Sequence, residues 1–178
     1  MAKMFLTPFN LRNEFRNLQH DFGEDILYIK INDSIKCSCF NEFYKFGDPD
    51  CLKCLGTGFN ITIEKIKVIN YNSMKNTVQH SKVGEIYSPI YTLYFDHTKN
   101  PKIKDRICLS EFSENQINIE AVCEITGTNA EKGNLGRNEF YTVQAKTRPE
   151  LLTQTQNFFN NLSSDNKELI IKGNEVSC

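Results

Sequence analysis

The chain has 178 residues, a formal net charge of −1 and seven cysteines. This length suits one well-buried domain with added segments, and the balanced charge excludes a nucleic-acid binder that relies on bulk positive charge. No segment approaches the roughly twenty apolar residues of a membrane helix, and the N-terminus lacks an apolar signal core. We therefore expect synthesis in a reducing cytoplasm and no membrane contact.

The first expected element is a helix within residues 1–25. Thr7 is expected to cap it, Pro8 to occupy its first position, and Gly23 to end it. Four apolar residues recur at helical spacing, namely Leu11, Phe15, Leu18 and Phe22. Such a stripe indicates core packing, and docking on a neighbouring subunit is the alternative.

A β domain is expected over residues 26–146. Alternation with a period of two begins at Ile26 and returns at Phe59, which predicts an antiparallel hairpin. Residues 36–58 then form a long insertion at its tip, where an ordinary connection uses about two to five residues.

The second strand of this hairpin changes phase. Ile61 and Ile63 share one face, whereas Ile66 falls on the other. This change predicts a β-bulge near Glu64 and Lys65.

The inserted loop contains two close cysteine pairs, Cys37-Ser-Cys39 and Cys51-Leu-Lys-Cys54. Four thiolates at such spacing predict a tetrahedral zinc site. The zinc would be structural, because four cysteines leave no open position for water or substrate. Two disulfides and four unrelated thiols are the alternatives; full disulfide pairing would leave one of the seven cysteines over.

The other three cysteines differ from this group. Cys108 and Cys123 lie in apolar, strand-like runs, where a small buried thiol is the ordinary explanation. Cys178 ends the sequence. We expect none of them to bind metal.

The rest of the β domain alternates strands and loops. Residues 73–84 are polar and predict a mobile loop. Further strands are expected at Tyr87–Phe95, Arg106–Leu109, Ile117–Thr126 and Glu139–Ala145. Pro89 is expected at an edge or bend, and the residues from Ile117 to Ile125 alternate cleanly enough to place their apolar side chains on one face.

Residues 127–136 predict a long exposed loop, either a tolerated surface loop or one that reaches a partner.

A second helix is expected over residues 147–162, opened by Pro149. One face carries Leu151, Leu152, Thr155, Phe158, Phe159 and Leu162. Residues 163–178 are expected to be a tail, in which residues 168–171 are the only stretch able to pair or pack. The whole pattern predicts a mainly β protein, a small antiparallel β-barrel or sandwich with flanking α-helices and a zinc loop inserted in a hairpin.

Recognisable catalytic motifs are absent from the sequence. It has no nucleophile elbow, phosphate-binding loop or dinucleotide fingerprint, and His20, His80 and His97 are far apart. His97, beside Asp96, is a weak candidate for a general base. We expect no enzymatic activity, no catalytic residues and no organic cofactor.

The cysteine loop with its Gly56-Thr57-Gly58 end resembles a loop in virion structural proteins of tailed bacteriophages. The run from Pro101 through Asp105-Arg106-Ile107, with the later Phe140-Tyr-Thr-Val strand, is similar to the small β-barrel of head-completion and neck (stopper) proteins. Together these resemblances cover roughly residues 26–146. Two positions depart from the pattern: Leu52 replaces a proline, and Lys104 replaces a glycine before the turn.

The resemblance implies a virion protein of the neck. Such a protein forms a homo-oligomeric ring below the portal, joins the head to the tail and helps to retain DNA; its partners would be the portal or adaptor and other neck or tail-completion proteins. It leaves contact with packaged DNA open. A tail or baseplate subunit, a zinc-ribbon nucleic-acid-binding protein and the zinc repeats of J-domain co-chaperones are the alternatives; the last occur four times per protein, whereas the unit occurs once here.

Overall fold

The computed structural model describes residues 10–71, 77–81, 84–88, 90–113, 116–133 and 136–177. Its elements in chain order are α1 (Leu11–Phe22), β1 (Glu24–Lys36), β2 (Phe59–Tyr71), β3 (Thr77–Ser81), β4 (Gly84–Ser88), β5 (Ile90–Asp96), β6 (Arg106–Phe112), β7 (Ile117–Lys132), β8 (Asn138–Thr147), the 3-10 helix η1 (Pro149–Leu151), α2 (Leu152–Asn161), α3 (Ser164–Ile171) and β9 (Val176–Ser177). The helices in this described part of the chain are too short and too polar to span a lipid bilayer.

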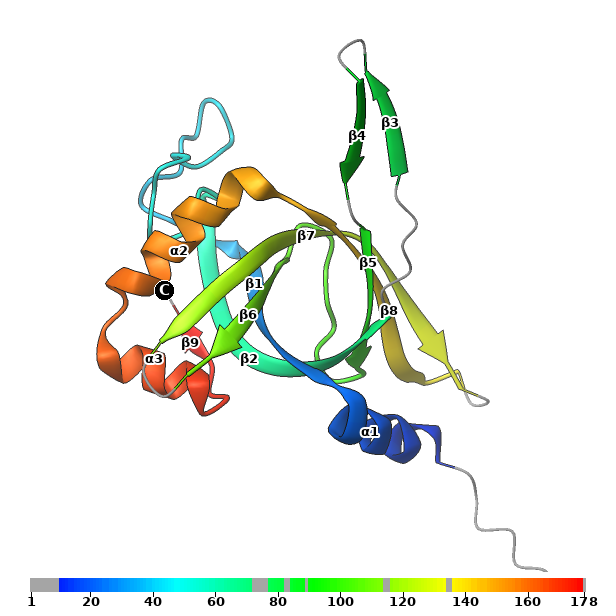
Figure 1. The fold of residues 1–178 in the computed structure, drawn as a ribbon. Helices are drawn as coiled ribbons and strands as arrows, with labels where there is room; N and C mark the ends of the chain where they lie inside the picture. Colours follow the sequence, from blue (N-terminus) through cyan, green and yellow to red (C-terminus); the bar gives the residue numbers. More distant parts are fainter. Residues whose placement is uncertain are drawn as a thin grey trace, which may run out of the picture.

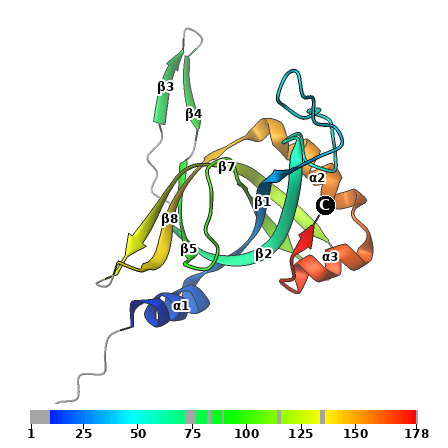
Figure 2. The same cartoon turned by 180° about the vertical axis from the view of Figure 1, so that it is seen from behind.

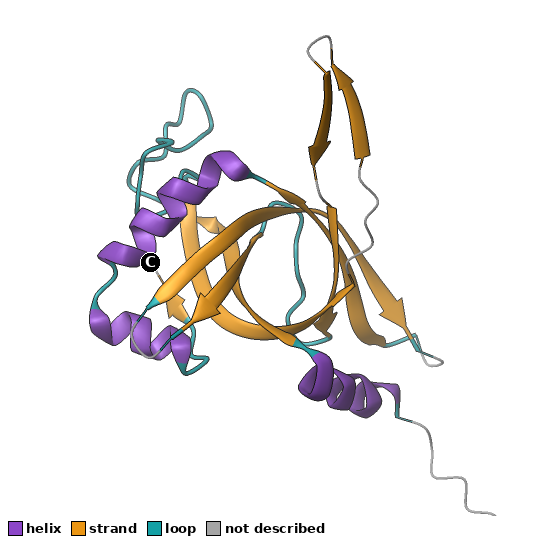
Figure 3. Cartoon of the chain, in the orientation of Figure 1, coloured by secondary structure: helices purple, strands orange, loops and turns teal. Residues whose placement is uncertain are grey.

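Six strands form a closed antiparallel barrel (Figure 1). They follow the order β1-β6-β7-β8-β5-β2, and β2 pairs back with β1 to close the ring. The helices α2 and α3 lie against one side of the barrel, and α1 lies at another (Figures 2 and 3). The expected mainly β fold, a small antiparallel barrel with flanking helices, is confirmed.

Four barrel strands, β1, β2, β6 and β7, bury side chains on both of their faces, whereas β5 and β8 bury only the face that points into the barrel. Ile26 and Tyr28 of β1 point into the barrel, where residues from all six barrel strands form one apolar cluster. Leu27 and Ile29 point the other way, into a second cluster that includes Phe159 of α2 and residues of α3 and β9. The fold therefore has an inner core within the barrel and an outer core between the barrel and the C-terminal helices.

These two cores explain the change of phase in β2. Its register with β1 runs without a shift from Asn60 to Val68, so the bulge expected near Glu64 and Lys65 is wrong. Ile63 belongs to the outer core and Ile66 to the inner core. The apolar face changes because a different core covers each half of the strand.

The prediction for β7 fails in the opposite way. Its sequence alternates cleanly, which predicts no bulge, but the strand contains one. Leu109 pairs with Ala121 and Ser110 with Ile119, so Glu120 is left without a cross-strand partner in β6. Consequently Ile119 belongs to the outer core and Ile125 to the inner core. The expectation that residues 117–125 present one apolar face is wrong, because a bulge reverses the side-chain direction beyond it.

The prediction of a long loop over residues 127–136 is also wrong, because a strand occupies much of this range. β7 continues to Lys132 and pairs with β8 from Gly127↔Gln144 to Lys132↔Asn138. At the turn, the Gly133 N–H donates to the carbonyl of Arg137 at 3.0 Å. Glycine and polar side chains are accommodated here because the extended hairpin exposes much of its surface.

Part of the loop expected at residues 73–84 is a hairpin. β3 pairs with β4 from Thr77↔Ser88 to Ser81↔Gly84, and this two-stranded sheet stands away from the barrel (Figure 1). The single strand expected from Tyr87 to Phe95 is divided between β4 and β5. The bend predicted at Pro89 lies outside the described residues.

Helix α1 packs with only part of its apolar stripe. The Phe15 ring stacks on Phe140 with centroids 4.9 Å apart, and Gln19 donates a hydrogen bond to the carbonyl of Lys67. Leu18 and Phe22 remain 50% and 73% exposed. The predicted cap at Thr7 and first turn at Pro8 lie outside the described residues.

The C-terminal region is more ordered than expected. Pro149 opens η1, which continues into α2 as the expected second helix. Residues 163–178, expected to be a tail, contain α3 and β9. Ile170 of α3 is fully buried, and β9 pairs with Thr62 and Ile63 of β2. The tail prediction is therefore wrong, although residues 168–171, the stretch expected to pair or pack, do pack as part of α3. The second element, β9, forms because β5 covers β2 only at Ile69–Tyr71, which leaves an edge of β2 open.

Candidate metal-binding loop

The four cysteines of the loop meet at one point. Cys37 follows the last residue of β1, and Cys54 lies five residues before β2. Their sulfur atoms, with those of Cys39 and Cys51, all lie within 4.8 Å of one another. The hairpin brings the two pairs together because β1 and β2 are antiparallel neighbours up to Lys36↔Phe59.

The spacing of these sulfur atoms suits a shared metal ion. The Sγ atoms of Cys37 and Cys51 are 3.9 Å apart, and those of Cys39 and Cys54 are 3.4 Å apart. A tetrahedron with metal–sulfur bonds of about 2.3 Å has edges of about 3.8 Å, whereas a disulfide requires about 2.05 Å. One metal ion could therefore bind all four thiolates.

The electrostatics of the group also suit a cation. A hydrogen bond from the backbone N–H of Cys39 lowers the pKa of the Cys37 thiol to about 7. Burial raises the pKa of Cys39 to about 12 and also raises the pKa of Cys54. Four neighbouring thiols resist ionising together unless a positive charge is present, so a bound cation would resolve the conflict.

Two glycines allow the loop to close around the cysteines. A Cβ atom on Gly47 would lie 2.4 Å from the Cα atom of Gly58. Gly58 also has a φ of +80°, and its N–H donates to the Cys54 sulfur at 3.3 Å. Neither position has room for a larger residue, so the contact of Gly47 with Gly58 is a structural requirement of the loop.

The barrel holds the loop through Arg106. This side chain is buried, and its Nη1 atom donates to the carbonyl of Leu55 at 2.6 Å. Leu55 itself is fully buried in the outer core. A second bond, from the Gln154 side chain to the carbonyl of Pro49, joins the loop to α2. The loop is therefore fixed to the barrel and to a helix as well as by its cysteines.

The residue before Arg106 fixes the turn that leads into β6. Asp105 accepts hydrogen bonds from the Tyr28 hydroxyl at 2.5 Å and from the N–H groups of Ile31 and Lys102, both at 2.9 Å. Burial and this carboxylate raise the pKa of Tyr28. Lys104 adopts a φ of +79°, which explains why a glycine would suit this position.

Sequence reasoning identified the four cysteines but missed Arg106, Leu55 and Gln154 as supports of the loop. Arg106 and Leu55 are separated by 51 residues, and Gln154 and Pro49 by 105. No local pattern reports such a contact. The only available signal was an arginine at the start of an apolar strand.

The remaining predicted candidates lie elsewhere. Cys108 is buried in the outer core and Cys123 in the inner core, and Cys178 is outside the described residues. His97 lies 3.1 Å from Asp96. Asp96 in turn accepts from Arg16 of α1 at 3.0 Å, so its contacts join a helix to the barrel.

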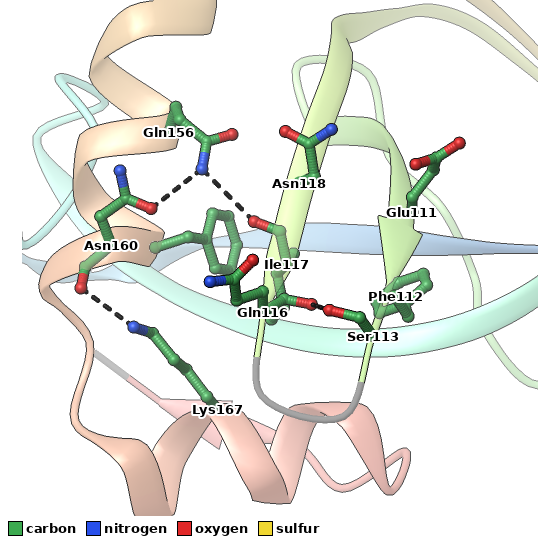
Figure 4. Close-up of a pocket in the computed structure, with 10 residues that line it drawn as sticks. Glu111, Phe112, Ser113, Gln116, Ile117, Asn118, Gln156, Asn160 and Lys167 are labelled. Carbon is green, nitrogen blue, oxygen red and sulfur yellow. Dashed lines mark hydrogen bonds between the residues drawn. The ribbon is translucent and has the colours of Figure 1, made fainter.

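A polar pocket of about 570 Å³ lies where α2 and α3 meet the β6–β7 hairpin (Figure 4). Gln156 crosses it, accepting from the Ile119 N–H at 2.8 Å and donating to the Ile117 carbonyl at 3.3 Å. β8 pairs with β7 only from Cys123 onward. The Gln156 amide thus occupies the edge of β7 as a neighbouring strand would, and its contacts are structural.

No protein-family model matches this sequence, and a search of curated proteins finds no match.

Proposed function

We propose that the chain is a structural subunit of the neck of a tailed bacteriophage, in a ring below the portal that joins head to tail and helps to retain DNA. The observation that carries the proposal is the cysteine loop, which is closed by four thiols and projects from a small barrel. The β3–β4 hairpin projects toward the same side of the molecule, and α1 lies on the opposite side (Figures 1 and 2). A ring subunit needs such a rigid body with reaching segments.

The metal in this proposal is structural zinc. Thiolates are soft ligands that select zinc over the hard ions magnesium and calcium. Cys37, Cys39, Cys51 and Cys54 would fill its four positions and leave none for substrate. Its role would be to order the loop, and the protein would have no catalytic activity. Elemental analysis of purified protein should give one zinc per chain; a metal-free protein with an ordered loop would contradict this assignment.

The nucleic-acid alternative receives less support from the loop. Residues 36–58 contain three lysines, Lys36, Lys45 and Lys53, against three acidic residues, Glu42, Asp48 and Asp50. Lys36 and Lys45 both contact Glu42, at 2.5 Å and 3.4 Å. A loop with balanced, paired charge offers little to a phosphate backbone. Steep salt dependence of binding to isolated DNA would favour this alternative instead.

The neck proposal is tested with particles assembled without this protein. We expect heads that package DNA and then lose it, with retention restored when the purified wild-type protein is added. Addition of a Cys51→Ser, Cys54→Ser double variant should restore much less. Stable, DNA-filled heads bearing defective tails would contradict the neck assignment and favour the tail or baseplate alternative.

Binding to a purified portal ring is the second test. The wild-type protein should bind the portal or portal–adaptor complex, and the double cysteine variant should bind more weakly. A wild-type protein without affinity for portal, adaptor and tail-completion proteins would overturn the proposal.

A further inference from the structure

The tip of the cysteine loop carries three exposed aromatic side chains. Phe43, Tyr44 and Phe46 are 84%, 62% and 53% exposed. Their rings contact one another, with centroids 5.0 Å apart for the first pair and 5.6 Å for the second. Exposed turns normally carry small or polar residues, so this aromatic turn needs a physical explanation.

The backbone of the aromatic turn is held in one shape. The Asn41 side chain accepts from the N–H groups of Phe43 and Tyr44 at 2.9 Å and 3.1 Å, and the Asn41 N–H donates to the Phe46 carbonyl at 2.9 Å. Lys45 adopts a φ of +59°. Because the rings stand on a fixed backbone, docking them would cost little backbone entropy.

An open apolar pocket of about 460 Å³ lies elsewhere on the same chain, between the loop and the α2–α3 turn. Its apolar lining includes Leu52 of the loop, Phe158 of α2 and Leu162, which follows α2; Asn161 also lines it. Leu52 is 42% exposed. We call this pocket the socket.

The aromatic turn does not fill the socket of its own chain, because none of the three aromatic residues lines it. Bonds from Gln154 to Pro49 and from Arg106 to Leu55 fix the base of the loop. The turn and the socket are therefore separate apolar surfaces of one molecule, and each has the chemistry that the other would bury.

We propose that the aromatic turn of one copy enters the socket of a second copy of this chain. Such a contact joins two different surfaces, so it is heterologous, and repetition of it produces a closed ring or an open filament. Aromatic anchors in apolar pockets dominate the energy of many interfaces, and the balanced loop charge favours an apolar partner over a phosphate backbone. The inference rests on the proposed function, because this contact would join neighbouring subunits of the proposed ring.

The test uses sedimentation of the full-length, metal-loaded protein. Wild-type protein should form species larger than a monomer in a concentration-dependent way. A Phe43→Ser, Tyr44→Ser variant should lose about tenfold or more in association constant, as expected for the truncation of aromatic anchors. Asn161→Arg, which places a long charged side chain at the socket, should have a similar effect, and Leu52→Gln provides a second socket variant that lacks the added charge.

Mixing the two types of variant gives the decisive result. A one-to-one mixture of the turn variant and the Asn161→Arg variant retains one intact turn and one intact socket, so it should form heterodimers and nothing larger. The control is Phe22→Ser on α1, which removes an equally exposed aromatic ring and should associate as wild type does.

The inference is overturned if wild-type protein stays monomeric at all concentrations, if the turn variant associates as wild type does, or if the mixture stays monomeric. It is also overturned if the turn variant loses binding to a DNA oligonucleotide while self-association persists. Portal binding is measured separately, so a chain that binds the portal but fails these tests would refute this contact and leave the neck proposal intact.

Discussion

The barrel interior and the cysteine loop achieve order by different means. Inside the barrel, large side chains such as Tyr28 and Phe95 are fully buried and pack edge to face at 5.5 Å. In residues 36–58, by contrast, Leu55 and two of the cysteines are the buried apolar side chains. A region with so little apolar burial requires cross-links and fixed hydrogen bonds, and the two regions should therefore respond to different perturbations.

The strongest test of this difference is removal of the metal that we propose. Structural zinc contributes on the order of 10 kcal/mol in small sites, so a chelator or the Cys54→Ser substitution should abolish hydrogen-exchange protection across residues 36–58. Protection of the barrel strands should remain. The matched control is Cys108→Ala, which changes a buried cysteine outside the cluster and should leave the loop protected. Unchanged protection of the loop after chelation would remove the distinction between the two regions.

The Phe95→Ala substitution tests the apolar packing inside the barrel. Loss of this fully buried ring should lower the free energy of unfolding by about 3–5 kcal/mol, measured by urea denaturation. The metal content of the protein that remains folded should not change, because Phe95 lies in the inner core. Phe22→Ala, at a 73% exposed position, should change stability by less than about 0.5 kcal/mol. Loss of metal from folded Phe95→Ala protein would show that the two regions are coupled.

Arg106→Met tests the link between the regions. It removes the donor to the Leu55 carbonyl, and an unsatisfied buried polar group costs about 1–3 kcal/mol. We expect a loss of stability in this range together with faster release of metal to a chelator. Arg148→Met is the comparison, because Arg148 pairs with Glu124 outside the loop and should not change metal release. Equal release rates in the two variants would argue against Arg106 as the link.

The smallest expected effect is a gain. Lys104 has a φ of +79°, a conformation that costs a residue with a side chain about 1–2 kcal/mol. Lys104→Gly should therefore raise the free energy of unfolding by roughly 0.5–1 kcal/mol after the greater entropy of glycine in the unfolded chain is included. Lys102→Gly, in the same turn but without positive φ, should be destabilising by about 0.4–1 kcal/mol. If both substitutions act in the same direction, backbone strain is not the cause.

Local patterns in the sequence predicted much of the architecture. The spacing of apolar residues identified both α1 and α2, and the length of the insertion between Ile31 and Phe59 located the cysteine loop. Short-range periodicity is sufficient for these features because they depend on neighbouring residues. The series of short strands separated by turn signals likewise predicted a small antiparallel barrel or sandwich, without deciding between the two.

The errors arose where long-range packing decides the outcome. The apolar phase of β2 changes because two cores cover it, and Glu120 forms a bulge that the regular pattern of β7 conceals. The α3 helix and β9 form because they cover the outer core and an open edge of β2. Arg106 supports the loop across 51 residues, which no periodicity can report.

The burial of β1 on both faces limits which changes this chain can accumulate. Residues 26 to 29 are each no more than 1% exposed, and successive side chains alternate between the two cores. A library that randomises this tetrapeptide should return almost entirely aliphatic and aromatic survivors, since a charge at any of the four positions would be desolvated. Mutational tolerance in this protein is thus concentrated at exposed positions of its projecting parts, away from the four cysteines and from Gly47 and Gly58, where new binding preferences could arise without loss of the barrel.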